Sequence, residues 1–222
     1  MGASSDTAAN SRETALVYSA LTAQTLISAA TYLAASRAME EIPPLTLVIC
    51  RFAVSTVCFV ALLLVRGAPR VPPKAELLRV LGLGVLAGPI NQGFFFLGLA
   101  KSTPAHAALL YALTPLGVYL VMLSRRQERM HAGRMLGIAI AFSGVAVLLL
   151  GRGLQAAFGP LIGDLSILVA VVAWVFYTAD GKALAERLGP MRATAWTMIA
   201  GALLSFPFAP LVFKSEAVFH AT

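Results

Sequence analysis

Charged side chains are scarce in this sequence. Asp, Glu, Lys and Arg together make up 12% of the 222 residues, and hydrophobic residues make up 59%. A soluble domain carries about 25% charged residues. A surface that faces water cannot be assembled from so few charges, so the composition excludes a soluble globular domain.

Acidic groups inside apolar segments and catalytic residue sets are also missing. None of the ten Asp and Glu residues lies in the middle of an apolar segment, which argues against the usual carboxylate proton relay. Proton coupling would then use His106 or a helix outside this sequence. The sequence has no Gly-rich loop ending in Lys-Ser or Lys-Thr, no metal-ligand cluster and no Ser/His/Asp set on one membrane face. We therefore expect no enzyme activity, no metal and no cofactor.

Cysteine is almost absent. Cys50 and Cys58 lie eight residues apart in one predicted helix, too far along the axis to form a disulfide bond with each other. We predict that both are packing residues.

Long apolar segments dominate what is present. Each is long enough to cross about 30 Å of hydrocarbon as a helix, and their continuous Ala- and Leu-rich runs disfavour strands. The sequence therefore predicts an all-α, polytopic transmembrane helical bundle. The first segment is too long for a signal core and is followed by six more, so we interpret it as a retained helix. The seven segments run from Ala15 to Ser36, Pro43 to Val65, Leu77 to Leu99, Thr103 to Ser124, Met135 to Leu150, Leu161 to Tyr177 or a turn beyond, and Thr194 to Phe213.

Basic residues alternate between rich and poor loops. Starting from the N-terminal tail, alternate loops hold 1, 4, 4 and 3 Lys or Arg residues, and the intervening loops hold 1 each; Arg51, inside a span, completes the 17. The richer side is cytoplasmic by the positive-inside rule. This pattern predicts a cytoplasmic N-terminus, and it assigns the net charge of +7 to the membrane surface, so no nucleic-acid partner is expected.

Two hinges of similar composition suggest an internal repeat. The first, Glu41 to Pro44, separates spans one and two, and the second, Arg187 to Pro190, separates spans six and seven. If span six restarts the pattern of span one, the unit has five helices. An odd number of helices inverts the second unit, and inverted repeats are typical of transporters.

Four stretches in this order resemble the EamA type of the drug/metabolite transporter superfamily. They are PLTLVICRF from Pro44, GLAKSTPAHAALLYALTP from Gly98, GIAIAFSGVAVLLLG from Gly137 and GDLSILVAVVAW from Gly163. The resemblance implies a ten-helix carrier of two inverted five-helix repeats, which moves small metabolites or amino acids across a bacterial inner membrane, often outward.

The sequence departs from that pattern because it contains seven of the ten expected helices. We assign residues 1–14 to a cytoplasmic tail, 15–151 to the first five-helix repeat and 159–222 to the start of a second. A fragment, an early end of the reading frame and a short natural form would each explain the three absent helices, and we expect a fragment or truncation.

Polar residues at helical spacing mark the candidate solute pathway. An unpaired polar group in lipid is costly, so such side chains should turn toward a shared interior. Gln24, Ser28 and Thr31 share one face of the first span, and Arg51, Ser55 and Cys58 share one face of the second. The predicted substrate-binding residues are Gln24, Ser28, Arg51, Asn91, Gln92, His106, Tyr111, Thr114, Trp174 and Tyr177.

Arg51 is the most informative of these residues. It lies about 12 Å below the predicted outer boundary, where an Arg costs about 2.5–3.5 kcal/mol. One interpretation is that Arg51 faces the cavity and holds an anionic group of the solute. The other is that it extends to the interface or pairs structurally with Asp164, Glu40 or Glu41.

Several residues have simpler interpretations. His106 is expected to form hydrogen bonds at a helix end, and Asp164 is expected to cap the sixth span. Asn91 and Gln92 are adjacent, so only one should face inward while the other bonds a neighbouring helix. The spacing of Gly84 and Gly88 supports close helix packing, and prolines such as Pro104 and Pro115 mark kinks.

These features favour a secondary transporter of small metabolites or amino acids that works by alternating access, and the resemblance implies that it is an exporter. A membrane scaffold or accessory subunit without transport activity is the alternative, and a membrane enzyme acting on lipids is a weaker third. The expected partners are a small-molecule solute and the lipid bilayer, and a homodimer is left open.

Overall fold

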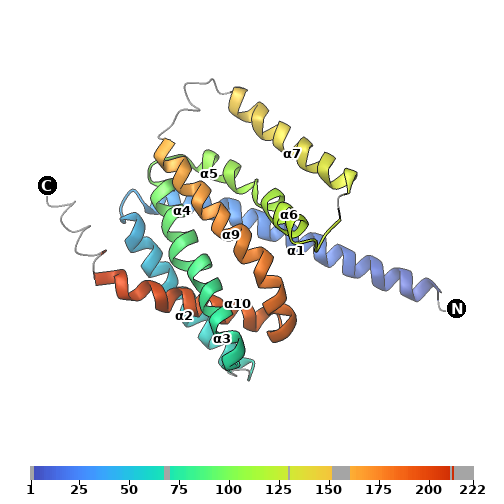
Figure 1. The fold of residues 1–222 in the computed structure, drawn as a ribbon, viewed down its shortest axis with the longest axis horizontal. Coiled ribbons are helices and arrows are strands. Elements are labelled where there is room, and N and C mark those ends of the chain that lie inside the picture. The colour runs from blue at the N-terminus through green and yellow to red at the C-terminus, as the bar shows by residue number, and fades with distance from the viewer. Residues whose placement is uncertain (1–2, 68–70, 130, 152–160, 211, 213–222) are drawn as a thin grey trace.

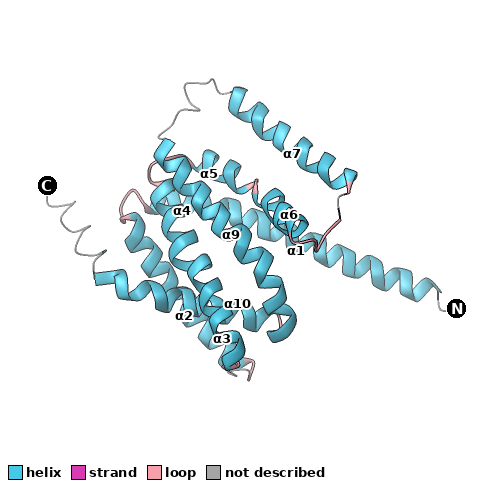
Figure 2. Cartoon of the chain, in the orientation of Figure 1, coloured by secondary structure: helices cyan, strands magenta, loops and turns pink. Residues whose placement is uncertain are grey.

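The computed structural model describes residues 3–67, 71–129, 131–151, 161–210 and 212. Every regular element in these ranges is a helix (Figure 2), which confirms the all-α prediction. The elements are α1 (Ala3–Ala38), α2 (Pro44–Val65), α3 (Lys74–Val85), the π-helical turn η1 (Leu86–Ile90), α4 (Asn91–Leu99), α5 (Pro104–Tyr111), α6 (Thr114–Ser124), α7 (Ala132–Gly151), α9 (Leu161–Leu188), α10 (Pro190–Ser205) and the 3-10 turn η2 (Phe206–Phe208).

Four helical stretches in the described ranges are long and apolar enough to cross a membrane. They are Pro44–Val65, Lys74–Leu99, Pro104–Ser124 and Leu161–Leu188. The first and fifth predicted spans fall within α1 and α7, and α10 covers the seventh from Thr194 to Ser205; the end of that span at Phe213 lies outside the described residues. Helix α1 begins at Ala3, so most of the segment that the sequence assigned to a tail is helical.

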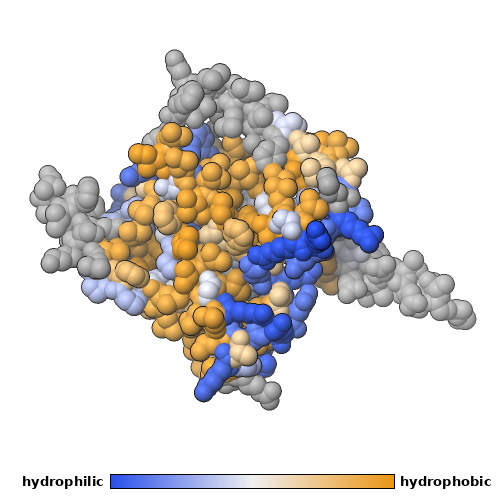
Figure 3. All heavy atoms as spheres, viewed as in Figure 1, coloured by the Kyte–Doolittle hydropathy of each residue, from blue (hydrophilic) through white to orange (hydrophobic). Residues whose placement is uncertain are grey.

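The surface of the bundle is largely apolar. Side chains such as Val54, Val57 and Leu78 are 65–80% exposed, and Figure 3 shows hydrophobic residues over the middle of one face. A surface of this kind requires lipid rather than water around it. Cys50 and Cys58 also lie exposed on α2. This exposure contradicts the prediction that they are packing residues.

Two predicted spans are interrupted, and a proline explains each interruption. Pro89 lies inside η1, where the Asn91 N–H binds the carbonyl of Leu86 five residues back. Pro115 has no N–H for the carbonyl of Tyr111, and the helix breaks at Ala112 and Leu113, between α5 and α6. Both interruptions border residues that line the cavity described below.

Helix α9 lies at the centre of the bundle in Figure 1, where it packs against α4, α5 and α6. Helix α10 packs against α2, α3 and η1. Figure 1 shows α7 separated from the other helices, with the N-terminal part of α1 extending beyond the bundle. The two helices assigned to a second repeat therefore pack among those of the first. The inverted relation between the repeats stays a prediction.

The contact of α10 with α3 and η1 is unusually close. A Cβ built on Gly84 would lie 2.8 Å from the Cβ of Ala200 and 2.9 Å from the N of Gly201. A Cβ built on Gly88 would lie 2.7 Å from the Cα of Gly201. We call this contact, formed by Gly84, Gly88, Ala200 and Gly201, the glycine seam. It confirms the close packing that the glycine spacing indicated.

The C-terminal end of α9 is fastened by ion pairs. The Arg187 Nη1 lies 2.6 Å from Glu76 Oε1 at the start of α3. Arg125, just after α6, pairs with Asp180, and this hydrogen bond raises the pKa of Arg125 above its ordinary value. Three of the loops that are rich in basic residues thus meet at one end of α9.

The N-terminal end of α9 meets the α4–α5 connection. Asp164 accepts a hydrogen bond from Ser102 Oγ at 2.5 Å, and its Oδ2 lies 3.1 Å from His106 Nδ1. Asp164 stands in the first turn of α9, which begins at Leu161, so it binds other elements instead of capping the helix as predicted. The contacts of the Lys101 loop at Asp164 therefore lie about 24–35 Å along α9 from those of the basic loops at Asp180 and Arg187.

Candidate functional site

A polar cavity lies between α1, α2, α4, α5 and α9. It has a volume of about 240 Å³ and is partly open to the surroundings, somewhat below the range of about 300–1,000 Å³ that is typical of ligand pockets. Its lining is Gln24, Ser28, Thr31 and Tyr32 from α1, Arg51 from α2, Asn91, Gln92 and Phe95 from α4, Tyr111 from α5 and Trp174 from α9. The structure therefore brings seven of the ten predicted site residues around one space.

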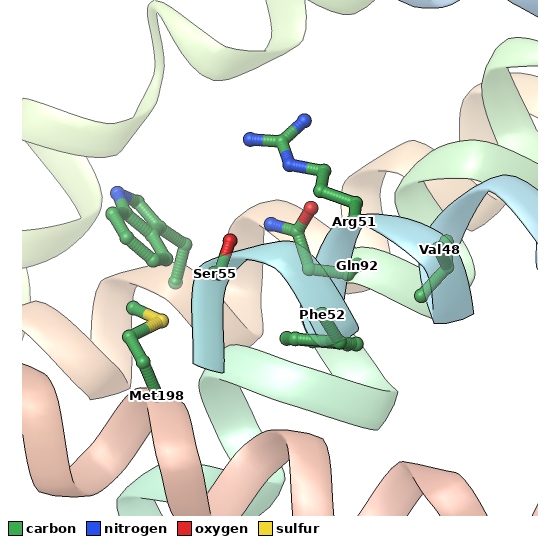
Figure 4. A pocket seen from close by; sticks show the side chains of 7 residues that line it. Val48, Arg51, Phe52, Ser55, Gln92 and Met198 are labelled. Atoms are coloured by element: carbon green, nitrogen blue, oxygen red, sulfur yellow. The ribbon is translucent and has the colours of Figure 1, made fainter. Parts of the chain in front are cut away.

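A second, smaller cavity adjoins the first. It has a volume of about 150 Å³ and extends the hollow toward α10; Figure 4 shows Arg51, Ser55, Gln92 and Met198 around it. Arg51, Gln92 and Trp174 line both cavities. These three side chains therefore border both cavities.

Arg51 has no carboxylate partner in the described part of the chain. Its Cζ lies 5.8 Å from the centre of the Phe96 ring, an arrangement in which the ring face attracts the cation. Two of the carboxylates considered as structural partners of Arg51 pair with other residues instead. Asp164 binds Ser102 and His106, and Glu40 pairs with Arg37. The geometry thus supports the interpretation that Arg51 faces the cavity.

Asn91 is the best-bonded polar residue of the site. It is 1% exposed, and its Nδ2 donates to the Tyr111 hydroxyl at 2.7 Å and to the Ala170 carbonyl at 2.8 Å. Gln92 Nε2 donates to Asn91 Oδ1 at 2.8 Å. The expectation that only one of the two amides would line the pathway is wrong, because Gln92 folds back onto Asn91 and both reach the cavity.

Aromatic rings form the apolar part of the wall. Tyr32, Phe95 and Tyr111 meet edge to face, with ring centres 5.5–6.2 Å apart. Trp174 stacks on Tyr177 at 4.9 Å. Such pairs prefer this geometry, so the rings form a continuous apolar part of the cavity wall.

Three predicted site residues lie elsewhere. His106 contacts Asp164 at the end of α9. Tyr177 stacks on Trp174, and its hydroxyl lies 3.3 Å from Thr197 Oγ1 of α10. The Thr114 hydroxyl is buried at the start of α6 without a hydrogen-bond partner among the described residues. None of these three lines the cavity of Arg51.

Tyr32 and Phe95 belong to the lining but were not predicted as substrate-binding residues. Aromatic side chains in an apolar helix carry no signal that separates a cavity wall from ordinary packing. Tyr32 follows Gln24 and Ser28 at i+8 and i+4, so the polar spacing of α1 could have identified it.

A helical bundle with an apolar outer surface, and with a polar cavity lined by an arginine that has no carboxylate partner in the described ranges, defines an integral membrane protein. Comparison with known sequences specifies the family. The model of the EamA-like transporter family matches residues 16–150, and the chain belongs to this family.

Curated relatives align with this chain at low sequence identity. An uncharacterized transporter of Archaeoglobus fulgidus is 28% identical over 167 residues, 75% of this chain and 58% of the relative. The uncharacterized transporter YyaM of Bacillus subtilis is 24% identical over 190 residues, 84% of this chain and 62% of the relative. The uncharacterized inner membrane transporter YedA of Escherichia coli K12 is 27% identical over 190 residues, 85% of this chain and 60% of the relative.

The chain thus spans about three fifths of the length of these relatives. No solved structure matches it.

Proposed function

We propose that the chain acts in secondary transport of a small solute that carries an anionic group, by alternating access, with export as the net direction. The single observation that carries this proposal is Arg51, a cation with no carboxylate partner in the described residues that lines both cavities. An arginine at this depth is costly, and an anionic solute would offset that cost by charge-assisted hydrogen bonds.

The family and the relatives support the same function. The chain belongs to a transporter family, and its relatives are named transporters, one of them in an inner membrane. We therefore propose a bacterial inner membrane as the location. A cytoplasmic N-terminus follows from the distribution of Lys and Arg, and the direction of export follows from the resemblance.

Counterflow in proteoliposomes tests transport. Vesicles loaded with an unlabelled organic or amino acid should take up the labelled compound saturably. Arg51→Gln should lower the initial rate at least about tenfold, because a hydrogen bond to a charged group contributes about 1.5–3 kcal/mol. Arg66→Gln, at the C-terminal end of the same helix, is the matched control and should transport normally.

Other outcomes would favour other functions. Absence of counterflow for every tested compound, with folded protein in the vesicles, would indicate a scaffold or accessory subunit. Loss of the Arg51→Gln protein from the membrane would indicate a structural role for the arginine.

Cysteine labelling tests the orientation. In a Cys50→Ala, Cys58→Ala background, a cysteine at Lys74 should react with an impermeant thiol reagent only in inside-out vesicles. A cysteine at Lys101 should react only in right-side-out cells. Labelling of both from one side would contradict the proposed topology.

A further inference from the structure

A further cavity lies between α6 and α7, away from the solute site. It has a volume of about 410 Å³, and no residue of its lining belongs to either cavity of Arg51. We call it the α6–α7 groove. Its lining is Ala112, Pro115, Leu116, Tyr119, Arg134, Gly137 and Ile138. Arg134 is the one charged residue of this lining, and most of the others are apolar.

The groove exists because α7 does not pack closely on α6. A Cβ built on Gly133 or Gly137 would meet no atom within 4 Å, and Figure 1 shows α7 set apart from the bundle. In a bilayer an empty apolar groove would forfeit contacts along its walls, so hydrocarbon should enter it. The groove therefore fits a lipid chain.

The two ends of the groove differ in polarity. Helix α6 ends at Ser124 and α7 begins at Ala132, so Tyr119 and Arg134 line the end next to the connecting loop. Ala112 lies about 10 Å farther from that loop than Tyr119, at about 1.5 Å per helical residue. A basic end and an apolar end match the head group and the acyl chain of a phospholipid.

Tyr119 fixes the connecting loop at the basic end of the groove. Its hydroxyl donates to the Arg129 carbonyl at 3.2 Å and accepts from the His131 N–H at 3.1 Å. Tyr119 itself is 8% exposed, so packing holds the ring while its hydroxyl holds the loop. Arg129 is thereby kept next to the groove, within reach of an anion that also contacts Arg134.

The connecting loop carries more positive charge than its ion pairs neutralise. Positions 125–134 include four arginines and one glutamate. Arg125 and Arg134 each pair with one carboxylate. Arg126 and Arg129 have no carboxylate partner among the described residues. Cations are therefore left to attract an anion to this end of the groove.

We propose that the α6–α7 groove binds one anionic phospholipid, with its phosphate at Arg129 and Arg134 and an acyl chain along Leu116 and Ile138. Basic pockets between transmembrane helices bind anionic head groups on the cytoplasmic side, which is the side that the distribution of Lys and Arg predicts for this loop. A free phosphate would leave the apolar part of the groove empty. The proposal is independent of solute transport.

Native mass spectrometry of the protein in detergent tests the head group. Phosphatidylglycerol and phosphatidylcholine with the same acyl chains are titrated separately, and the affinity of the first bound lipid is measured. Phosphatidylglycerol should bind more tightly. Arg129→Gln should weaken its binding about fivefold, the contribution of one basic residue near a membrane surface, and leave phosphatidylcholine unchanged. Lys182→Gln is the matched control, because Lys182 lines a different cavity, of about 300 Å³, and should change neither affinity.

Gly137→Leu tests the apolar part of the groove. The space around a Cβ at this position is open, so the variant should fold, and its side chain should occupy the place of the acyl chain. Phosphatidylglycerol should then bind no more tightly than phosphatidylcholine. Gly133→Leu lies one turn earlier in α7, where the space is also open but outside the lining, and should bind both lipids like the native chain.

Four outcomes would overturn the proposal. Equal binding of the two lipids to the native protein would do so without any variant. Loss of the preference in Lys182→Gln but not in Arg129→Gln would assign it to the other cavity. Retention of the preference in Gly137→Leu would show that the anion meets the loop alone. Conversion of a dimer to monomers by Gly137→Leu, seen in the same spectra, would assign the groove to a second copy of the chain.

Discussion

The glycine seam and the polar cavity are two contrasting interfaces of one bundle. In the seam, α10 meets α3 and η1 at backbone distance, with no side chain between Gly88 and Gly201. In the cavity, α1, α2, α4, α5 and α9 hold polar side chains around an open space. Small residues allow the first contact, and a network centred on Asn91 supports the second. The difference indicates that α3 and α10 form a rigid unit, while the solute site lies where the helices do not close.

The largest expected effect comes from filling the seam. Gly84→Leu would place side-chain atoms where the backbone of α10 lies, and overpacking of this kind costs about 3 kcal/mol. Thermal unfolding in detergent should show a strongly destabilised or unfolded protein. Gly82→Leu, two residues away on α3 with no atom within 4 Å of a built Cβ, should unfold like the native chain. Equal effects would mean that the seam does not determine stability.

The next effect comes from removing the centre of the cavity network. Asn91→Leu leaves the Ala170 carbonyl and the Gln92 NH₂ without their partner, at a cost of about 1–2 kcal/mol. Unfolding measured by the same assay should show a smaller loss than Gly84→Leu. A larger loss would reverse the comparison and make the cavity wall the more rigid interface.

A third, smaller effect is expected at Tyr111. Tyr111→Phe keeps the ring contacts with Tyr32 and Phe95 and removes only the hydroxyl that accepts from Asn91. Hydrogen bonds between membrane helices average about 0.6 kcal/mol, so the loss of unfolding free energy should be of that size. An effect as large as that of Asn91→Leu would show that the two residues act as one unit, and a double variant would then add nothing.

The smallest effect is expected at Thr114. Its buried hydroxyl has no partner among the described residues, so Thr114→Val should be neutral or stabilise the protein by less than about 1 kcal/mol. Clear destabilisation in the unfolding assay would show that this hydroxyl is hydrogen-bonded in the bilayer, and would extend the polar network past α5.

The sequence predicted the helices and much of the cavity for the same reason. Helical spacing aligns Gln24 with Ser28, and it places Arg51 on a face of its own helix. Lipid excludes such side chains from the outside, so faces of this kind converge. Spacing along one helix cannot show how far along the bundle a residue lies, which is why His106 and Thr114 were grouped with the cavity.

Contacts between helices could not be predicted from the sequence. The binding of Asp164 to Ser102 and His106 joins segments far apart in the chain, whereas a capping role needs only local information. Continuation of α9 to Leu188 was underestimated because its last turns carry charges that end the apolar pattern while the helix itself continues beyond the bilayer.

The interruption between α5 and α6 gives one wall of the cavity a joint. Tyr111 ends α5 beside the solute space, whereas Gly117 in α6 is locked against Val175, whose side chain would lie 2.5 Å from a built Cβ. A turn without its full set of hydrogen bonds bends more easily than a continuous helix. The joint therefore lies beside the cavity, where Tyr111 contacts Asn91, while α6 is packed closely on α9.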